Sequence, residues 1–151
     1  MDENILLQKP ELELNESAKE FLREAAKWAY FLSILGFIGI GLIVLVAIFA
    51  GTIFSAIGSM TPGMGGFGSS FGIVLTVVYL IIALLYFFPV YYMNKFATNA
   101  KTALQENDTE SLALSFEYLK SHYKFIGIMS IIGLCLYGLI IVFAIIAALA
   151  R

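Results

Sequence analysis

Residues 28–57 read WAYFLSILGFIGIGLIVLVAIFAGTIFSAI, a stretch without one Asp, Glu, Lys, Arg or His. At a rise of about 1.5 Å per residue it makes roughly 45 Å of helix, whereas the hydrocarbon core of a bilayer is about 30 Å thick. The stretch is too short for two crossings and generous for one tilted crossing. We therefore predict a transmembrane helix over 28–57, with Trp28 and Tyr30 as aromatic anchors at the membrane interface.

Two further stretches lack charge in the same way. Residues 71–93 read FGIVLTVVYLIIALLYFFPVYYM, and residues 125–150 read FIGIMSIIGLCLYGLIIVFAIIAALA. Only 13% of the chain is charged, whereas a soluble domain carries about 25%. Hydrocarbon accommodates such stretches at the lowest cost, so we predict an all-α membrane protein with three transmembrane helices. Pro89 removes one backbone hydrogen bond, and we expect it to kink the second span.

The segments before and between the spans are less apolar. Residues 1–14 contain Pro10 and show no helical period, so we expect a flexible tail ahead of a single membrane domain over 15–151. Ser17 and Glu20 fit a capping box, which predicts an amphipathic helix that leads into the first span. Six glycines in 58–72 favour a flexible, non-helical connection, because a phosphate-binding loop would also need a lysine.

The only sizeable polar connection is 94–124. Its apolar residues follow helical spacing on both sides of a short polar stretch, which predicts a helical hairpin outside the membrane. Asn107, three residues before Glu110, is the expected N-cap of the second helix. The apolar face of the hairpin needs a surface, and three are available: the hairpin's own helices, the membrane face or a partner protein. Packing within the chain is the simplest, and a partner protein is the extension of function.

Basic residues indicate the orientation of the chain. Eight of the nine Lys and Arg precede the first span or lie in 94–124, and only Arg151 falls on the other side. The positive-inside rule then predicts a multi-pass protein of the cell (inner) membrane, with the N-terminus and the hairpin in the cytoplasm and the C-terminus outside. A net charge of −2 without a basic face argues against nucleic acid as a partner.

Each span carries a stripe of small or weakly polar residues. Such residues let helix backbones approach closely in lipid, where no hydrophobic force drives helices together. We predict that they pack helices within one chain or between chains; the alternative is that they line the path of an oligomeric channel or transport component. The helix-packing candidates are Ser33, Gly36, Ala47, Gly51, Thr76, Tyr79, Ala83, Tyr86, Ser130 and Tyr137. The absence of an ionisable residue at membrane depth favours packing over transport.

Residues that could carry chemistry are few. His122, the only histidine, has no clustered partner, so we interpret it as a solvated hairpin residue rather than a base or a ligand. Met60 and Met64 could bind copper, but two methionines are weak evidence, and Cys135 stands alone in an apolar run. No nucleophile lies beside a base. We therefore expect neither catalysis nor a cofactor or metal.

Three segments also carry a resemblance. They are KWAYFLSILGFIGIG at 27–41, FFPVYYMNKFATNAKTAL at 87–104 and LKSHYKFIGIMSIIGL at 119–134. There the chain resembles an uncharacterised family of small bacterial membrane proteins, classed as a domain of unknown function, over nearly all of 17–147. The resemblance implies a multi-span membrane fold and supplies no catalytic residues. Residues and resemblance together favour a structural or accessory protein that binds the lipid bilayer and assembles with itself or with a larger membrane complex.

Overall fold

The computed structural model describes residues 14–61 and 65–149, and its described part consists of three long helices. The helices are α1 (Glu16–Met60), α2 (Gly65–Glu106) and α3 (Thr109–Leu149). Each is long and apolar enough to cross a membrane. This confirms the predicted all-α class with three spans, and the chain is a multi-pass membrane protein. The predicted flexible tail, 1–14, lies outside the described residues except for Leu14.

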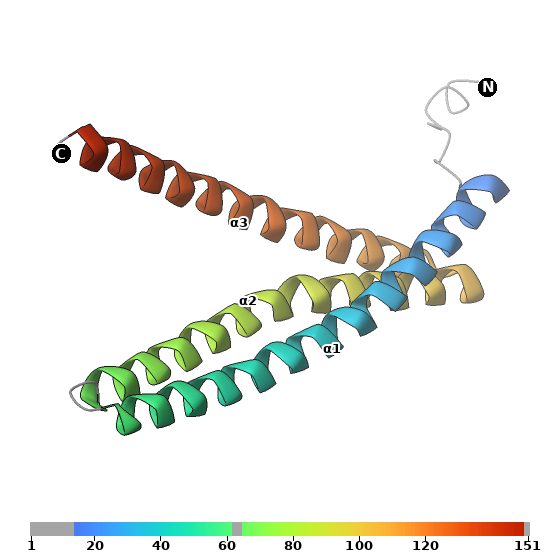
Figure 1. The fold of residues 1–151 in the computed structure, drawn as a ribbon. Coiled ribbons are helices and arrows are strands. Elements are labelled where there is room, and N and C mark those ends of the chain that lie inside the picture. The colour runs from blue at the N-terminus through green and yellow to red at the C-terminus, as the bar shows by residue number, and fades with distance from the viewer. Residues whose placement is uncertain (1–13, 62–64, 150–151) are drawn as a thin grey trace, which may run out of the picture.

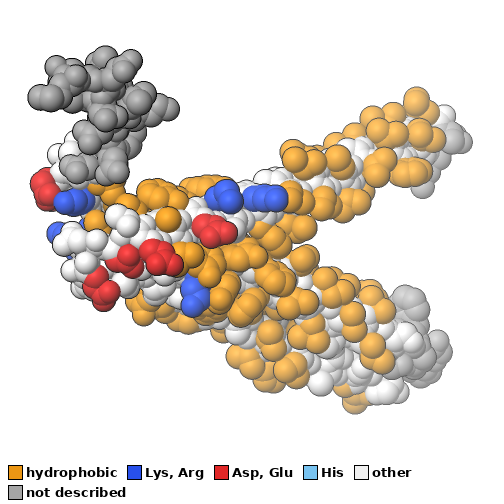
Figure 2. Space-filling model, turned by 180° about the vertical axis from the view of Figure 1, so that it is seen from behind, with side chains coloured by type: hydrophobic (Ala, Val, Ile, Leu, Met, Phe, Trp, Pro, Cys, Tyr) orange, Lys and Arg blue, Asp and Glu red, His pale blue; other side chains and the backbone are white. Residues whose placement is uncertain are grey.

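α2 is the central helix, because α1 and α3 each pack against it. Figure 1 shows α1 beside α2 along most of its length, whereas α3 meets α2 near the turn that joins them and then diverges. A small core of Ala26, Phe96 and Ala100 lies toward the polar end, with Tyr118 and Leu119 of α3 packed against it. Charged side chains gather at this end and apolar ones cover both diverging arms (Figure 2).

α1 begins two residues earlier than its predicted capping box. The side chain of Asn15, not Ser17, caps the helix by accepting a hydrogen bond of 2.8 Å from the backbone N–H of Ala18. The prediction of Ser17 and Glu20 as the cap was wrong. Asn caps a helix as well as Ser does, and the earlier start adds a backbone bond from the Lys19 N–H to the Asn15 carbonyl.

The Gly-rich connection is shorter than predicted. α1 continues to Met60 and α2 begins at Gly65, so the expected non-helical segment 58–72 is largely helical; residues 62–64 lie outside the described part. Glycine lowers helix propensity in water. A helix that has already formed extends at low cost because each added residue gains a backbone hydrogen bond, and this gain offsets the unfavourable helix propensity of glycine, about 1 kcal/mol per residue.

The turn between α2 and α3 uses Asn107 and Asp108 in different roles. Asn107 has a φ of 51°, and the Asp108 N–H reaches back to the Ala103 carbonyl at 3.2 Å, which closes the end of α2. The Asp108 carboxylate accepts from the N–H groups of Glu110 at 3.0 Å and Ser111 at 3.2 Å. The prediction of Asn107 as the N-cap was therefore wrong by one residue: Asn107 ends α2, and Asp108 caps α3.

Candidate functional site

Small residues form the interface between α1 and α2. Ala47 is fully buried, Ala83 is 5% exposed, and Gly51 and Gly72 are buried against each other. A Cβ added at Gly72 would lie 2.6 Å from the carbonyl oxygen of Gly51, and one at Gly51 would collide with the Thr76 hydroxyl. Only glycine allows the two backbones to approach this closely.

The interface continues to Gly36, where a side chain of α2 rather than its backbone lies beside the glycine. A Cβ at Gly36 would lie 2.7 Å from a Val90 methyl group, so the valine occupies the space that a side chain would need. Nearer the connection between α1 and α2, the Thr76 hydroxyl lies 3.2 Å from the Ala47 carbonyl and 3.0 Å from the Gly72 carbonyl. This hydroxyl is engaged between the two helices. It does not project into an open path.

A second polar contact ties α1 to α2 at the end of the spans nearer the charged residues. The Asn94 side-chain amide donates to the Ser33 hydroxyl at 2.9 Å, and that hydroxyl donates to the Tyr30 carbonyl at 2.7 Å. Ser33 has no exposed surface. Each polar group thus finds a partner within the chain, as groups in a water-poor environment must. Asn94 was not among the residues predicted from the sequence; its amide at the end of an apolar span was the available signal.

The contact between α2 and α3 includes the buried side chain of His122. Its side chain is only 7% exposed, and its Nδ1 lies 2.8 Å from the Pro89 carbonyl oxygen. A carbonyl oxygen only accepts hydrogen bonds, so Nδ1 carries the proton and donates. The interpretation of His122 as a solvated residue was wrong. Helical spacing alone did not reveal that α3 crosses α2 at this position, where the side chain is covered.

Pro89 lies inside α2. Because proline has no N–H, the carbonyl of Leu85 loses its usual helical partner. The expected kink at Pro89 stays a prediction. Aromatic rings cluster around this level of α2, including the Phe88–Phe125 pair at 5.8 Å between ring centroids, which also joins α2 to α3.

The remaining packing candidates are less buried within the described chain. Tyr79 is half-buried, Tyr86 is 59% exposed, and Ser130 and Tyr137 of α3 are exposed. No residue in the most apolar 18-residue window of α3 is buried. The structure therefore brings Ala47 and Gly51 of α1 together with Thr76 of α2, buries Ser33 and Ala83, and leaves the candidates of α3 open.

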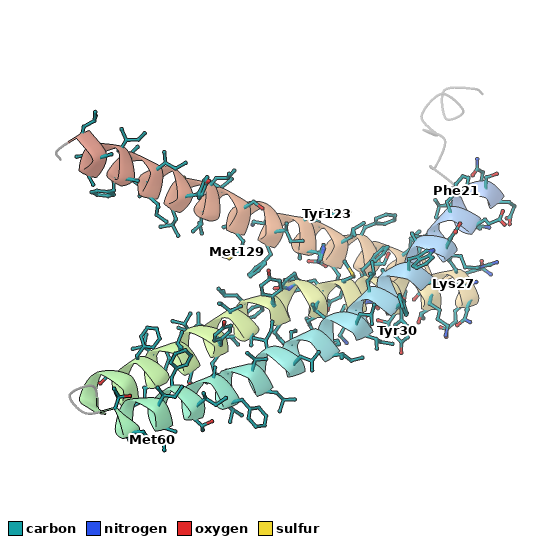
Figure 3. The ribbon with its side chains drawn as sticks, viewed as in Figure 1. Phe21, Lys27, Tyr30, Met60, Tyr123 and Met129 are labelled. Atoms are coloured by element: carbon teal, nitrogen blue, oxygen red, sulfur yellow. The ribbon has the colours of Figure 1, made fainter. Side chains whose placement is uncertain are left out.

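Candidates for chemistry remain scattered. Among the described residues no three His, Cys, Asp or Glu side chains are placed to hold a metal ion, and Cys135 is exposed on α3. Of the two methionines weighed as copper ligands and set aside, Met60 is exposed at the end of α1 (Figure 3) and Met64 lies outside the described residues.

Comparison of the chain with models of protein families, with curated proteins and with solved structures gives no match. The resemblance to an uncharacterised membrane-protein family stays a prediction.

Proposed function

We propose that this protein is a small structural or accessory protein of the membrane, which associates through α3 with a second copy of itself or with a larger membrane complex. One observation carries the proposal. Tyr137 is 64% exposed, and its hydroxyl has no hydrogen-bond partner within the described part of the chain. In this proposal the protein performs no chemistry of its own and acts by holding membrane helices together.

The depth of Tyr137 gives this observation its weight. Tyr137 lies near the middle of the uncharged stretch 125–150, roughly 18 Å of helix from either end. At that depth water is absent, and a hydroxyl gains free energy when it finds a partner on another helix. Tyrosines that lack such a partner are typical of the interface, where the hydroxyl reaches water. A facing helix would supply the acceptor.

The surface around Tyr137 suits a close helix partner. Ser130, Gly133 and Ala144 share its face of α3 by helical spacing. A Cβ placed at Gly133 would meet nothing within 4 Å, so the groove there is open to an approaching helix. Small residues that flank a hydroxyl are the pattern found in interfaces between membrane helices.

The first experiment removes the hydroxyl alone. In Tyr137→Phe we expect self-association in lipid vesicles, measured by energy transfer between labelled copies, to weaken about threefold, because an interhelical hydrogen bond contributes about 0.6 kcal/mol. The matched control is Tyr123→Phe, which changes an equally exposed tyrosine of α3 outside the apolar span. Equal association of all three proteins would count against the proposal.

A second experiment identifies the face. Leu134 lies about one helical turn from Tyr137. Successive residues are rotated by about 100° around the helix axis, so Cys135 points about 160° away from the direction of Tyr137. In Leu134→Cys/Cys135→Ala, oxidation in the membrane is expected to give crosslinked dimers, whereas the native Cys135 is expected to give few. Crosslinking of both cysteines to the same extent would indicate random collision.

The alternative function, an oligomeric channel, needs a water-filled path lined by the small and weakly polar residues of the spans. Thr76, one of its expected lining residues, hydrogen-bonds backbone carbonyls of α1 and α2, which disfavours it as a pore residue. Reconstituted vesicles are expected to remain impermeable to ions and small solutes across voltage and pH; a conductance that changes in Tyr137→Phe would favour the channel instead.

We also propose an orientation in the cell (inner) membrane. The N-terminal end of α1 and the turn between α2 and α3 would face the cytoplasm, with the C-terminus outside. The placement of eight of the nine basic residues on that side supports this orientation. Cysteine labelling from one side of sealed membranes, at Ser17→Cys and at Thr109→Cys, tests it, since both positions should react from the same side.

A further inference from the structure

A partly open cavity of about 580 Å³ lies between α1 and α2 at the charged end of the molecule. Its volume falls within the range of natural ligand sites. Ala26 and Ala97 form part of the wall, and Arg23, Lys27 and Lys101 bring three cations to it. Lys27 and Tyr30 lie on successive turns of α1 where that helix passes α2 (Figure 3).

No acidic side chain lines this cavity. Arg23, Lys27 and Lys101 form no ion pair and no side-chain hydrogen bond within the part of the chain that the structure describes. Glu20 and Glu24 line a neighbouring hollow that Arg23 and Lys27 also line, and neither glutamate comes within ion-pair distance of these two residues. Three cations thus line one cavity whose own lining contains no acidic side chain.

Hydrogen-bond donors complete the lining. The hydroxyls of Tyr30 and Thr102 have no protein partner among the described residues, and Gln105 adds a side-chain amide. Guanidinium and ammonium groups with neutral donors around them are the chemistry that recognises phosphate oxygens. The cavity therefore suits a phosphate-bearing anion.

The depth of the cavity indicates where such an anion comes from. Lys27 immediately precedes the uncharged stretch that begins at Trp28, and Lys101 lies eight residues beyond Met93, at most roughly 12 Å below the end of the second span. The headgroup layer is about 5–8 Å thick on each side of the hydrocarbon. The upper part of the cavity therefore lies at the level of lipid phosphates, and the lower part extends just beyond it.

The surface above the cavity is apolar. The face of α1 that carries Lys27 and Tyr30 continues into the membrane as Ile34 and Ile38, which are 40% and 55% exposed. Acyl chains can lie along these side chains while the headgroup occupies the cavity. We propose that this cavity, lined by Arg23, Lys27 and Lys101, binds the headgroup of an anionic phospholipid. Basic pockets between membrane helices recognise such headgroups in general.

The test measures lipid binding to the full-length protein in detergent by native mass spectrometry. Phosphatidylglycerol is expected to be retained in preference to phosphatidylcholine, which carries no net charge. In Lys27→Gln/Lys101→Gln we expect retention of phosphatidylglycerol to fall about 25-fold, since each basic residue near an anionic surface contributes about fivefold. Equal retention of the two lipids by the unaltered protein would overturn the proposal.

The matched control is Lys120→Gln/Lys124→Gln. It removes the same charge from α3, at two residues that do not line the cavity. A loss below about twofold is expected there; a loss equal to that of the cavity variant would show a general surface charge effect and overturn the site. Lys27→Arg/Lys101→Arg is expected to retain the lipid, which separates loss of charge from damage to the fold, and circular dichroism checks the helix content of every variant.

A soluble phosphate compound is the other source of the same chemistry. Glycerol 3-phosphate, which carries the phosphate without acyl chains, is expected to compete only weakly with phosphatidylglycerol, because it lacks the contacts along Ile34 and Ile38. If glycerol 3-phosphate bound as tightly as the lipid, the lipid assignment would be overturned, and the cavity would be a site for soluble phosphates.

Discussion

The α1–α2 pair and the arm of α3, the part of that helix that diverges from α2, are similarly apolar. They differ in packing, because α1 and α2 contact each other and the arm contacts no other helix within the described chain. In the pair, glycine, alanine and serine lie between the helices, and Thr76 and Asn94 donate hydrogen bonds across the interface. In the arm, Gly127, Gly133 and Gly138 have open space where a Cβ would lie, and the Tyr137 hydroxyl has no partner in the described chain. The comparison indicates that apolar composition favours insertion of a helix into the membrane. Which helices then pack depends on small residues and on polar groups that find partners across the interface.

The largest expected difference between the two regions comes from filling a glycine. Gly51→Val places a side chain against Thr76 and the Gly72 carbonyl. We expect it to destabilise the α1–α2 pair by about 1–3 kcal/mol, the range for overpacking a close contact. Gly138→Val makes the same substitution at an open position of α3 outside the Tyr137 face and is expected to change stability by less than about 0.5 kcal/mol. The free energy of unfolding in bicelles checks this difference. An equal decrease in both variants would show that valine destabilises either helix regardless of packing.

Loosening the crossing of α2 and α3 ranks second. In His122→Ala the Pro89 carbonyl loses a donor, and we expect a loss of about 1 kcal/mol together with a broader spread of α3 positions. The sole cysteine, Cys135, and an added Leu84→Cys accept spin labels whose distance distribution reports that spread. His122→Asn keeps a donor and should narrow the distribution again; an unchanged distribution in His122→Ala would show that the hydrogen bond does not position α3.

The polar link between Asn94 and Ser33 is expected to contribute less. A double-mutant cycle of Asn94→Ala and Ser33→Ala isolates their coupling, and we expect about 0.6 kcal/mol, the average for hydrogen bonds between membrane helices. Both residues lie in one hydrogen-bond chain, so their effects should not add. Additive losses would mean that the 2.9 Å contact contributes only through packing.

The smallest expected effect lies at the start of α3. Hydrogen bonds from Ser111 and the Glu110 amide lower the pKa of Asp108 below its ordinary value of 3.8. A carboxyl group with a lowered folded pKa stabilises the folded state above its ordinary pKa, and this contribution disappears as pH falls through the folded value. Hydrogen-exchange protection of the Glu110 and Ser111 amides should fall in that acidic range. Asp108→Asn should remove the pH dependence and keep a cap.

The sequence predicted the features that depend on long uniform stretches. Three charge-free runs were enough for the helices and their order, because the cost of charge in hydrocarbon is large and local in sequence. Helix ends were less predictable. Asn15 and Ser17 are comparable caps, and Asn107 precedes an equally good cap in Asp108, so small energy differences decided each boundary.

Features that join distant residues could not be read from the sequence. The Asn94–Ser33 bond links residues 61 positions apart, and the His122–Pro89 bond links residues 33 apart. The basic cavity is lined by residues of both α1 and α2. The sequence of either helix alone does not show which residues of the other helix lie beside it. Periodicity gives the face of a helix on which a residue lies. It does not say which helix covers that face, and so it did not distinguish the closed pair from the open arm.

Cys135 offers the most direct test of the central claim, that the uncharged arm of α3 lies in hydrocarbon while α1 and α2 form the closed pair. It is the only cysteine and is exposed, so the unaltered protein takes a spin label at the middle of the span. In reconstituted vesicles we predict frequent collisions of the label with oxygen, which concentrates in hydrocarbon, and few with a water-soluble nickel chelate. A label that collides readily with the chelate would place this part of α3 in water and contradict the account.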